Sequence, residues 1–583
     1  MYILGFNCFM DDASACVLRD GEIVVAVEEE RLTRRKHDGS FPARAIARCL
    51  EVAGIEVDDL DHVAFNFSPF HDFHHRLASV LRGMPQSLRF AGSRGPDWLA
   101  MARVARTFRQ RIGPGRYRFH FVEHHMAHAA SAFFLSPFEE AAILAIDGSG
   151  ESASTVQARG VGRRIEWLRS IHFPQSLGYL YMALTQYLGF RKNSGEGKVM
   201  GLASYGDPAR FRDAFGEIAR PREQGAYALD LSYFQHQLGA PLFYSPKVPA
   251  TFGQPARIPE SEIDPFHEDV AAALQERLEE LCFHVLRDLH RRTGSTKLCL
   301  AGGVALNCSM NGLVRSHTPF SELFVPPAAS DSGGGLGAAL WVHHQVLGHE
   351  RREPLRHAFL GVAYETRDLT ATIEDDYRVE TVDAVERAAE LLAAGHCIGW
   401  FQGSSELGPR ALGARSILAD PRSPTMADHI NARVKFREAF RPFAPAVLEE
   451  RASEFFADYV PSPFMLLNFR ARPVGASVIP AVVHVDGTSR VQGVTREECP
   501  LFHALIERFA ERTGVPVLLN TSLNVRGEPL AETPRDALRT FEASGLDDLI
   551  LGDLHVRKTA RANRASTVES PPIENGSPER LTA

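Results

Sequence analysis

The pattern that most constrains the fold is an apolar run that leads into a polar turn, and the chain carries it twice. Residues 2–7 form the first run, and residues 11–31 add two apolar stretches around the turn Arg19-Asp20-Gly21. Residues 141–160 repeat the arrangement, with an apolar run that enters a turn at residues 147–150. Apolar runs bounded by such turns are typical of strands and hairpins. The duplication therefore predicts two related lobes.

Strands alternate with helices along most of the chain, which predicts the α/β class. Residues 268–292 carry apolar side chains at three- and four-residue intervals, as a helix does, and a buried strand with a glycine turn follows at residues 297–307. A charged stretch with a proline at residues 348–357 marks the expected boundary between a domain at 1–355 and a second α/β domain at 356–560. Residues 561–583 are polar and rich in Pro and Ser, which predicts a disordered tail.

Composition argues against several classes of protein. The formal charge of −8 and the pI near 6.3 give no net attraction to nucleic acid, and we interpret the basic runs at residues 31–36 and 103–118 as solvated surface. No apolar run reaches the roughly 18 residues of a membrane span, and no secretory leader is evident. Eight cysteines are scattered without a CxxC pair, as in reduced cytosolic proteins. We expect a cytoplasmic protein without nucleic-acid or membrane partners; a homodimer stays open.

Four residues of the first domain have the pattern of metal ligands. His124 and His128 follow an apolar strand at residues 117–122 and lie one helical turn apart, so their imidazoles face the same way. Packing or helix capping is the alternative interpretation. Asp147 ends a strand at a glycine turn, and Asp331 precedes three glycines, so both carboxylates are expected at a cleft. A site with two histidines and two aspartates suits Fe(II), Mn or Zn.

Glycine-rich loops and clustered cations indicate phosphate chemistry. Loops at residues 147–150, 302–307 and 333–335 place flexible backbone N–H groups beside helix starts, although each could be a plain turn. In the second domain, residues 406–441 and 486–524 concentrate Arg and Lys beside glycines and prolines. Guanidinium groups clamp phosphate and carbamate oxygens in pairs. An exposed ion-pair network is the alternative for this region.

These motifs together resemble the O-carbamoyltransferases that modify antibiotics and nodulation factors, such as the tobramycin and cephem enzymes. The resemblance rests on HHMAH (124–128), DGSGE (147–151), GEGKVMGLASYG (195–206), AGGVALN (301–307) and SDSGGG (330–335), and it covers nearly the whole chain except the tail. It implies a two-lobed first domain with the fold of actin, sugar kinases and heat-shock ATPases. It implies a YrdC-like second domain.

The resemblance also implies site residues in both domains. The implied metal ligands are His124, His128, Asp147 and Asp331. The residues implied near a nucleotide in the first domain are Gly148, Ser149, Gly302, Gly303, Asn307 and Gly333. The residues implied to hold carbamoyl phosphate and ATP in the second domain are Arg410, Lys435, Arg441, Arg490, Asn520 and Ser522.

The implied activity is sequential. The second domain makes carbamoyl-adenylate from carbamoyl phosphate and ATP, with Mg²⁺ accompanying the ATP. The first domain then transfers the carbamoyl group to a hydroxyl of a small natural product such as an antibiotic, glycoside or polyketide. A sugar or metabolite kinase of the same fold is the main alternative, because fold does not fix function. A carbamoyltransferase acting on tRNA or protein and a non-catalytic ATP-binding regulator also stay open.

One departure from the family concerns the general base. Many relatives have His-Asp after the first strand, whereas Asp11 stands here where histidine is expected, followed by Asp12. Candidate bases are Asp11, Asp12, His37 and Asp230, each with a turn or capping role as the alternative. Lys36 belongs to a Lys-His segment that lines the transfer site in the family, so it is expected to take part in catalysis.

The acceptor cleft is expected where aromatic residues gather. Residues 66–120, with His71, His74, His75 and Trp98, and residues 225–265, rich in Tyr, Phe and Pro, are predicted to shape it. Aromatic walls fit a sugar face and a macrolide or polyketide ring equally well, so the identity of the acceptor does not follow from them.

Overall fold

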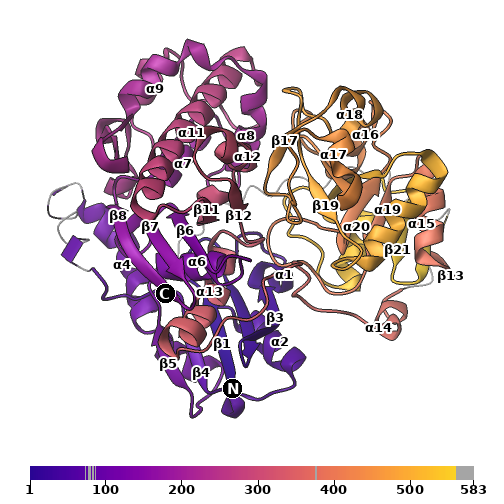
Figure 1. Ribbon diagram of the computed structural model, residues 1–583, viewed down its shortest axis with the longest axis horizontal. Coiled ribbons are helices and arrows are strands. Elements are labelled where there is room, and N and C mark those ends of the chain that lie inside the picture. The colour runs from indigo at the N-terminus through magenta and orange to yellow at the C-terminus, as the bar shows by residue number, and fades with distance from the viewer. Residues whose placement is uncertain (73, 76–80, 82–83, 86, 374–376, 560–583) are drawn as a thin grey trace.

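The computed structural model describes residues 1–583 except 73, 76–80, 82–83, 86, 374–376 and 560–583, so the predicted tail lies outside the described residues. An N-terminal domain, with strands β1 to β12, lies beside a C-terminal domain, with strands β13 to β22 (Figure 1). The prediction of a two-lobed α/β domain followed by a further α/β domain is confirmed. No helix among the described residues is long and apolar enough to cross a membrane.

The two lobes of the N-terminal domain have the same topology. In each sheet the central strand pairs antiparallel with one neighbour and parallel with the other. The strands of the first lobe are, in spatial order, β3 (Glu22–Glu28), β2 (Ser14–Arg19), β1 (Tyr2–Asn7), β4 (His62–Phe65) and β5 (Arg118–Phe121). Those of the second lobe are β8 (Arg164–His172), β7 (Ala153–Val161), β6 (Glu140–Ile146), β11 (Lys297–Ala301) and β12 (Glu322–Phe324). The repeated sequence pattern is thus a repeated lobe.

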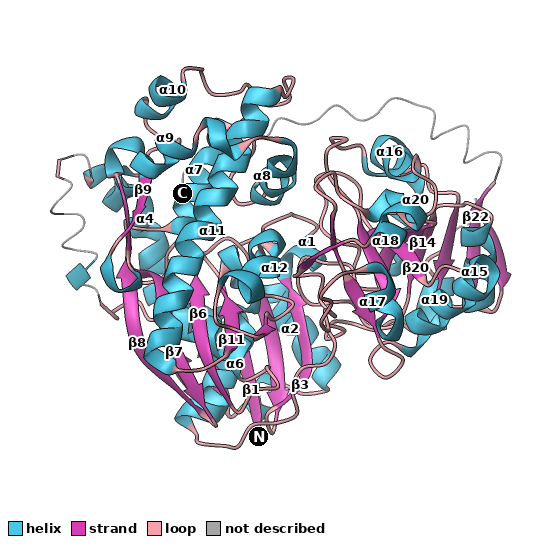
Figure 2. Cartoon of the chain, turned by 45° about the horizontal axis from the view of Figure 1, so that its top comes forward, coloured by secondary structure: helices cyan, strands magenta, loops and turns pink. Residues whose placement is uncertain are grey.

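Helices cover the sheets of both lobes (Figure 2). The longest, α11 (Pro265–Thr293), begins where the Asp264 side chain caps the first turn, and it ends at Gly294, whose φ of +67° closes the last turn. The other helices of this domain are α1 (Glu29–Thr33), α2 (Ala43–Ala53), α4 (Leu88–Ala102), α5 (Val104–Arg111), α6 (His124–Phe133), α7 (Leu177–Tyr187), α8 (Glu196–Leu202), α9 (Arg212–Ile218), α10 (Lys247–Phe252), α12 (Cys308–His317) and α13 (Gly334–Trp341). A small hairpin joins β9 (Ala219–Pro221) to β10 (Tyr227–Leu229).

Helix α13 brings the two lobes together because its glycines permit close backbone contact. A Cβ added at Gly337 would lie 1.9 Å from the carbonyl oxygen of Ala127 on α6. A Cβ added at Gly335 would lie 2.9 Å from Cα of Phe6 on β1. The helix therefore packs directly on both elements, and its start is held close to α6.

We expect Gly337→Ala to destabilise the N-terminal domain by about 1–3 kcal/mol, because the new methyl group forces α13 and α6 apart. A lower urea midpoint would show this. Gly197 is a matched control, since it lies in a helix and a Cβ added there meets no atom within 4 Å. Gly197→Ala should be neutral or stabilising by about 0.5–1 kcal/mol. Equal effects of the two changes would contradict the packing argument.

The C-terminal domain is built on one mixed sheet of eight strands (Figure 1). In spatial order these are β13 (Tyr377–Thr381), β22 (Leu554–Lys558), β21 (Asp548–Leu551), β14 (Ile398–Phe401), β15 (Arg415–Ala419), β20 (Val517–Ser522), β16 (Ala444–Leu448) and β19 (Gln492–Val494). A two-stranded sheet pairs β17 (Asn468–Arg470) with β18 (Thr488–Arg490). The helices are α14 (Thr366–Thr370), α15 (Ala384–Ala393), α16 (Met426–Ile430), α17 (Ala452–Phe455), α18 (Pro473–Val478), α19 (Pro500–Thr513) and α20 (Pro534–Glu542).

Two arginines of the basic run at residues 31–36 bind the C-terminal domain. Arg31 is only 2% exposed and donates to the carbonyl of Gly408 (2.6 Å). Arg34 donates to the carbonyl of Leu530 (2.7 Å). Our interpretation of this run as solvated surface is therefore wrong for these two residues, because the C-terminal domain covers them. The arginines between residues 103 and 118 are exposed, as expected.

Candidate active site

Two histidines and two aspartates converge between the lobes. His124 and His128 lie one turn apart on α6, Asp147 follows β6, and Asp331 directly precedes α13. The two imidazole Nε2 atoms are 3.1 Å apart. Asp147 Oδ2 lies 3.2 and 3.0 Å from them, and Asp331 Oδ1 lies 3.6 and 3.4 Å from them. Both histidines are fully buried, and the ligand atoms of the four residues lie close enough together to hold one ion.

This set fits a divalent metal ion. Ligand atoms held about 2.1 Å from one ion lie about 3.0–3.4 Å from each other at tetrahedral or octahedral angles. The distances between the imidazole nitrogens and the carboxylate oxygens are 3.0–3.6 Å, within this range or 0.2 Å above it. Nitrogen and carboxylate ligands suit Fe(II), Mn and Zn, and the geometry does not choose among them.

The electrostatics of the set favour a positive charge. Burial by itself would lower the pKa of His128, but hydrogen bonds to Asp147 and Asp331 outweigh it and raise that pKa to about 10. Burial would raise the pKa of Asp147, yet the hydrogen bonds from His124 and His128 hold it well below its usual range. Two carboxylates with little exposure thus create a field that a divalent cation can neutralise.

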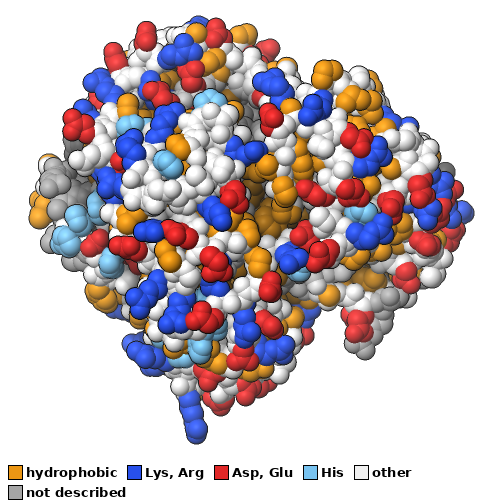
Figure 3. All heavy atoms as spheres, viewed as in Figure 1, with side chains coloured by type: hydrophobic (Ala, Val, Ile, Leu, Met, Phe, Trp, Pro, Cys, Tyr) orange, Lys and Arg blue, Asp and Glu red, His pale blue; other side chains and the backbone are white. Residues whose placement is uncertain are grey.

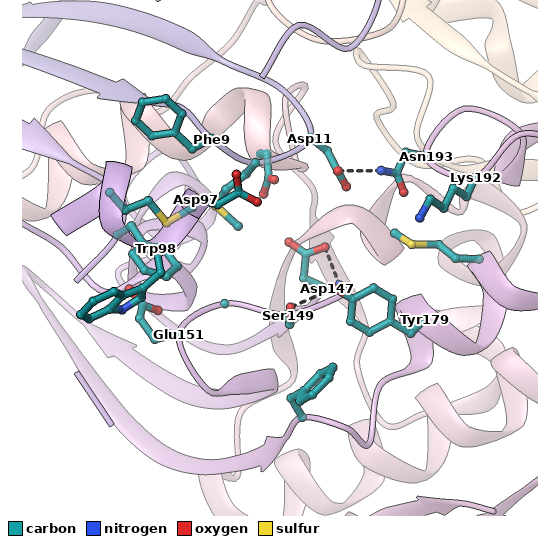
Figure 4. Close-up of a pocket in the computed structure, with 18 of the residues that line it drawn as sticks. Phe9, Asp11, Asp97, Trp98, Asp147, Ser149, Glu151, Tyr179, Lys192 and Asn193 are labelled. Carbon is teal, nitrogen blue, oxygen red and sulfur yellow. Dashed lines mark hydrogen bonds between the residues drawn. The ribbon is translucent and has the colours of Figure 1, made fainter. Parts of the chain in front are cut away.

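A pocket opens beside the two aspartates, and Figure 4 shows its polar side chains facing one another. Its apolar walls are formed by Phe9, Met10, Phe67, Phe90, Trp98, Met101, Phe173, Tyr179, Met182 and Phe243. Its polar groups are Asp11, Asp97, Asp147, Ser149, Glu151, Lys192, Asn193 and Asp331. Both segments predicted to shape an aromatic cleft contribute to these walls, whereas His71, His74 and His75 do not line the pocket.

Several polar groups of the pocket were missed from the sequence, among them Lys192, Asn193 and the hydroxyl of Tyr179. Asn193 donates through Nδ2 to Asp11 Oδ1 (2.6 Å), and Tyr179 OH lies 3.1 Å from Ser149 Oγ. The ammonium of Lys192 lies 3.7 Å from the centre of the Phe243 ring. The available signal was position: Lys192 and Asn193 directly precede the motif at residues 195–206.

The candidate bases lie in three different settings. Asp11 lines the pocket. Asp12 and His37 are paired with each other, with 2.9 Å between Asp12 Oδ1 and His37 Nδ1. Burial lowers the pKa of His37, but the bond to Asp12 outweighs it and raises that pKa, which disfavours a free basic imidazole. Asp230 caps a turn through the Ser232 amide (3.0 Å), is exposed and does not line the pocket, so a structural role accounts for it.

Some residues of the glycine loops line the pocket, and others do not. Gly148 and Ser149 line the pocket. A Cβ added at Gly302, whose φ is +87°, would lie 2.1 Å from the carbonyl oxygen of Ile146, and one added at Gly333 would lie 2.0 Å from that of Ala328. Gly303 and Asn307 do not line this pocket either, and the Asn307 side chain caps α12 by accepting from the Met310 amide (2.9 Å). Packing and capping thus account for Gly302, Gly333 and Asn307, and their nucleotide contacts stay a prediction.

The cations predicted in the C-terminal domain gather into one cluster. Its members are Arg410, Lys435, Arg437, Arg441 and Arg490. Burial, together with the positive charges of Arg490 and Arg441, lowers the pKa of Arg410 to about 9. Burial and the neighbouring arginines likewise lower the pKa values of Lys435 and Arg437. Cations crowded in this way are stabilised by bound anions.

Lys435 is a buried member of the cluster. The residue is 4% exposed, and its ammonium donates to the carbonyl of Ser522 (2.7 Å) and to Asn524 Oδ1 (2.7 Å). Asn520 is also buried and donates to the carbonyl of Ala411 (3.2 Å). These bonds hold the end of β20 against the loop that carries Arg410. Arg437 was missed as a member because it reads as one more cation in a basic stretch.

Comparison with known families decides between the interpretations. A model described as Carbamoyltransferase N-terminus matches residues 2–340, and one described as Carbamoyltransferase C-terminus matches residues 389–558. The chain belongs to the carbamoyltransferase family. It is therefore an enzyme of carbamoyl transfer, as the resemblance in its motifs implied.

Relatives of this carbamoyltransferase cover most of its length. Nodulation protein NolNO of Sinorhizobium fredii is 40% identical over 95% of this chain and 80% of that protein. Nodulation protein NolO of Bradyrhizobium diazoefficiens is 42% identical over 75% and 79%, and an uncharacterised protein of Synechocystis sp. is 38% identical over 97% and 98%. Among solved structures, HypF of T. kodakarensis matches 60% of this chain and 48% of its own with a TM-score of 0.33 and 14% identity, too remote a likeness to bear on activity.

Proposed function

We propose that the chain is an ATP-dependent O-carbamoyltransferase with two consecutive sites. In the C-terminal domain, water cleaves carbamoyl phosphate to carbamate and phosphate. A carbamate oxygen then attacks the α-phosphorus of ATP, which forms carbamoyl-adenylate as pyrophosphate leaves. In the N-terminal domain, the hydroxyl oxygen of a small-molecule acceptor attacks the carbamoyl carbon, and AMP leaves. Mg²⁺ accompanies the ATP.

The cationic cluster of the C-terminal domain carries this proposal. A carbamoyl phosphate and an ATP bring several negative charges to one place, and Arg410, Arg441 and Arg490 can clamp their oxygens in pairs. Positive charges that are already fixed in place stabilise the charge that develops at an attacked phosphorus. A kinase of the same fold would have no use for a second domain with such a cluster.

Lys36 links the two sites. Its side chain is exposed, yet protein packed around the ammonium lowers its pKa, and the positive charge of Arg441 lowers it further. The lysine therefore lies where the cluster of the C-terminal domain approaches the N-terminal domain. An ammonium in this position can hold the phosphate of an adenylate as the intermediate passes from one domain to the other.

The pocket beside Asp147 and Asp331 supports transfer to a hydroxyl. A divalent metal held by the histidines and aspartates would polarise a carbonyl and orient the reacting groups. Asp11 lies in the pocket and accepts from Asn193, so its carboxylate is positioned to take a hydroxyl proton from an acceptor. The aromatic walls favour an acceptor with a flat apolar face, such as a sugar or a polyketide ring.

The test is the identity of the nucleotide product. Purified protein with ATP, carbamoyl phosphate, Mg²⁺ and Fe(II) should form AMP and pyrophosphate in a reaction that depends on carbamoyl phosphate. Chromatography of the nucleotides and a pyrophosphate assay would measure both. Formation of ADP alone would overturn the proposal in favour of a kinase. Mass spectrometry of candidate acceptors for the gain of one carbamoyl group would then identify the substrate.

A further inference from the structure

An ion pair crosses the boundary between the two domains at the edge of the cationic cluster. Lys198 on α8 donates to Glu438, with 2.7 Å between Nζ and Oε1. The two side chains are only 21% and 19% exposed, so the pair is shielded from solvent on most sides. In Figure 1, α8 lies on the side of the N-terminal domain that faces the C-terminal domain, next to the hollow visible between the domains in Figure 3.

Glu438 is a carboxylate placed among cations. Its other oxygen, Oε2, lies 3.9 Å from the Arg441 guanidinium, and Arg526 lies 4.0 Å from Oε1. Burial would raise the pKa of Glu438, but the bond from Lys198 and the charges of Lys198 and Arg441 outweigh it and lower that pKa. The carboxylate is therefore ionised at neutral pH. It lies between Arg441 of the cationic cluster and Lys198 of the N-terminal domain.

Apolar contacts lie around the same pair. The Phe190 and Phe440 rings meet edge to face with 6.3 Å between their centres. A Cβ added at Gly201 on α8 would lie 3.5 Å from Pro442. The segment 436–442, which carries Arg437 and Arg441, is thus pressed against the N-terminal domain by one ion pair and two apolar contacts. Lys198 also approaches Lys36, since its charge helps to lower the pKa of Lys36.

We infer that the Lys198–Glu438 ion pair is a positioning contact that keeps water out of the domain boundary. It would do so while the activated carbamoyl group crosses from the cationic cluster to the pocket beside Asp147 and Asp331. The inference rests on the proposed function. Without the seal, water replaces the acceptor: its oxygen attacks the carbamoyl carbon of carbamoyl-adenylate, AMP leaves, and the carbamic acid formed breaks down to carbon dioxide and ammonia. The ion pair would therefore decide how much ATP is consumed without a product.

The chemistry of the pair explains why it would act as a seal. A shielded ion pair loses more when it is separated than an exposed one, because the freed charges are incompletely solvated. Separation of the domains at this edge would leave Glu438 with Arg441 and Arg526 of its own domain, and Lys198 without its carboxylate partner. The closed arrangement is thus favoured as long as both partners are charged.

The experiment uses water as the acceptor, so no substrate needs to be known. AMP and pyrophosphate formation from ATP and carbamoyl phosphate is measured without an acceptor in the whole protein. We expect Lys198→Met to raise AMP release about fivefold or more, because the loss of one interaction of this kind shifts such an equilibrium by a factor of that order. Lys198→Arg keeps the charge and should stay near the natural enzyme. Hydrogen exchange of residues 436–442 should rise in Lys198→Met and not in Lys198→Arg.

Glu260→Gln is the matched control, because it removes another ion pair between the domains, with Arg526 (2.6 Å), whose glutamate is 61% exposed. It should change neither AMP release nor exchange. If Lys198→Met left AMP release and hydrogen exchange unchanged, the ion pair would not seal the boundary. Equal effects of Lys198→Met and Glu260→Gln would contradict the inference as well. Absence of AMP formation in every variant and in the natural enzyme would overturn the proposed function, and this inference with it.

Discussion

Replacing His128 by alanine should stop carbamoyl transfer and leave adenylate formation intact. The change removes an Nε2 atom that lies 3.0 Å from Asp147 and 3.4 Å from Asp331, so a metal held by the four groups would lose one of its four ligands. Loss of metal polarisation costs several kcal/mol of transition-state stabilisation, which corresponds to about a 10²- to 10³-fold slower transfer. Pyrophosphate formation should persist, because we propose that the cationic cluster of the other domain forms the adenylate. Metal content, pyrophosphate and carbamoylated product are measured on the same preparation.

His125→Leu is the matched control for this experiment. His125 is a buried neighbour on α6, and burial with the charges of His124 and His128 lowers its pKa to about 3, so its ring is neutral. An apolar side chain of similar size should therefore keep the helix and the metal. If His128→Ala and His125→Leu were equally impaired, helix disruption would explain both. If His128→Ala also lost pyrophosphate formation, the division of labour between two sites would be wrong.

The four residues of the candidate metal site could be named from the sequence because each carries a local signal. A pair of histidines at i and i+4 faces one way on any helix, and an aspartate at a strand end beside glycines has few apolar neighbours. The sequence does not show that Asp331 meets His128, since this depends on α13 packing closely against α6. Gly337 permits this packing. In the sequence it is only one residue of a glycine-rich stretch.

Contacts between the domains had no local signal. Arg31 and Arg34 belong to a basic run that is typical of solvated surface, yet the C-terminal domain covers both. Lys198 and Glu438 are far apart in the chain, and neither residue alone indicates an ion pair. Asp230 was a candidate only because carboxylates at turns are ambiguous between capping and catalysis. Tertiary contacts decide the surroundings of the two arginines and of the ion pair, and periodicity does not encode such contacts.

The fold itself was the easier part. Both hairpins and the long helix α11 follow from apolar periodicity and turn residues. The equal topology of the two lobes follows from a repeated sequence pattern. The strand order that buries the apolar strands of one lobe also buries the matching strands of the other. The order of the eight strands of the C-terminal domain pairs segments up to about 180 residues apart, such as Tyr377 with Lys558, and nothing local predicts such pairs.

Replacing Arg441 by alanine should have the opposite effect to the His128 change. Arg441 is partly exposed, with 33% of its side chain open, and it lies near Arg490 and Arg526, whose charges lower its pKa after the larger effect of burial. Its loss removes a paired donor for the phosphate oxygens of carbamoyl phosphate or ATP. Removal of one fixed donor at a developing charge costs about 10²- to 10³-fold in rate, so pyrophosphate formation should fall by that factor. Metal content of the N-terminal domain should not change.

Two further variants make this result decisive. Arg441→Lys keeps the charge without the planar fork, so it should recover only part of the rate if the guanidinium binds two oxygens at once. Arg433→Ala removes an exposed arginine of the same segment that does not belong to the cluster, and it should leave pyrophosphate formation unchanged. The two-site scheme requires Arg441→Ala and His128→Ala to fail at different steps. A common failure at one step would mean that a single site performs both reactions, because separate sites cannot lose the same step through residues of different domains.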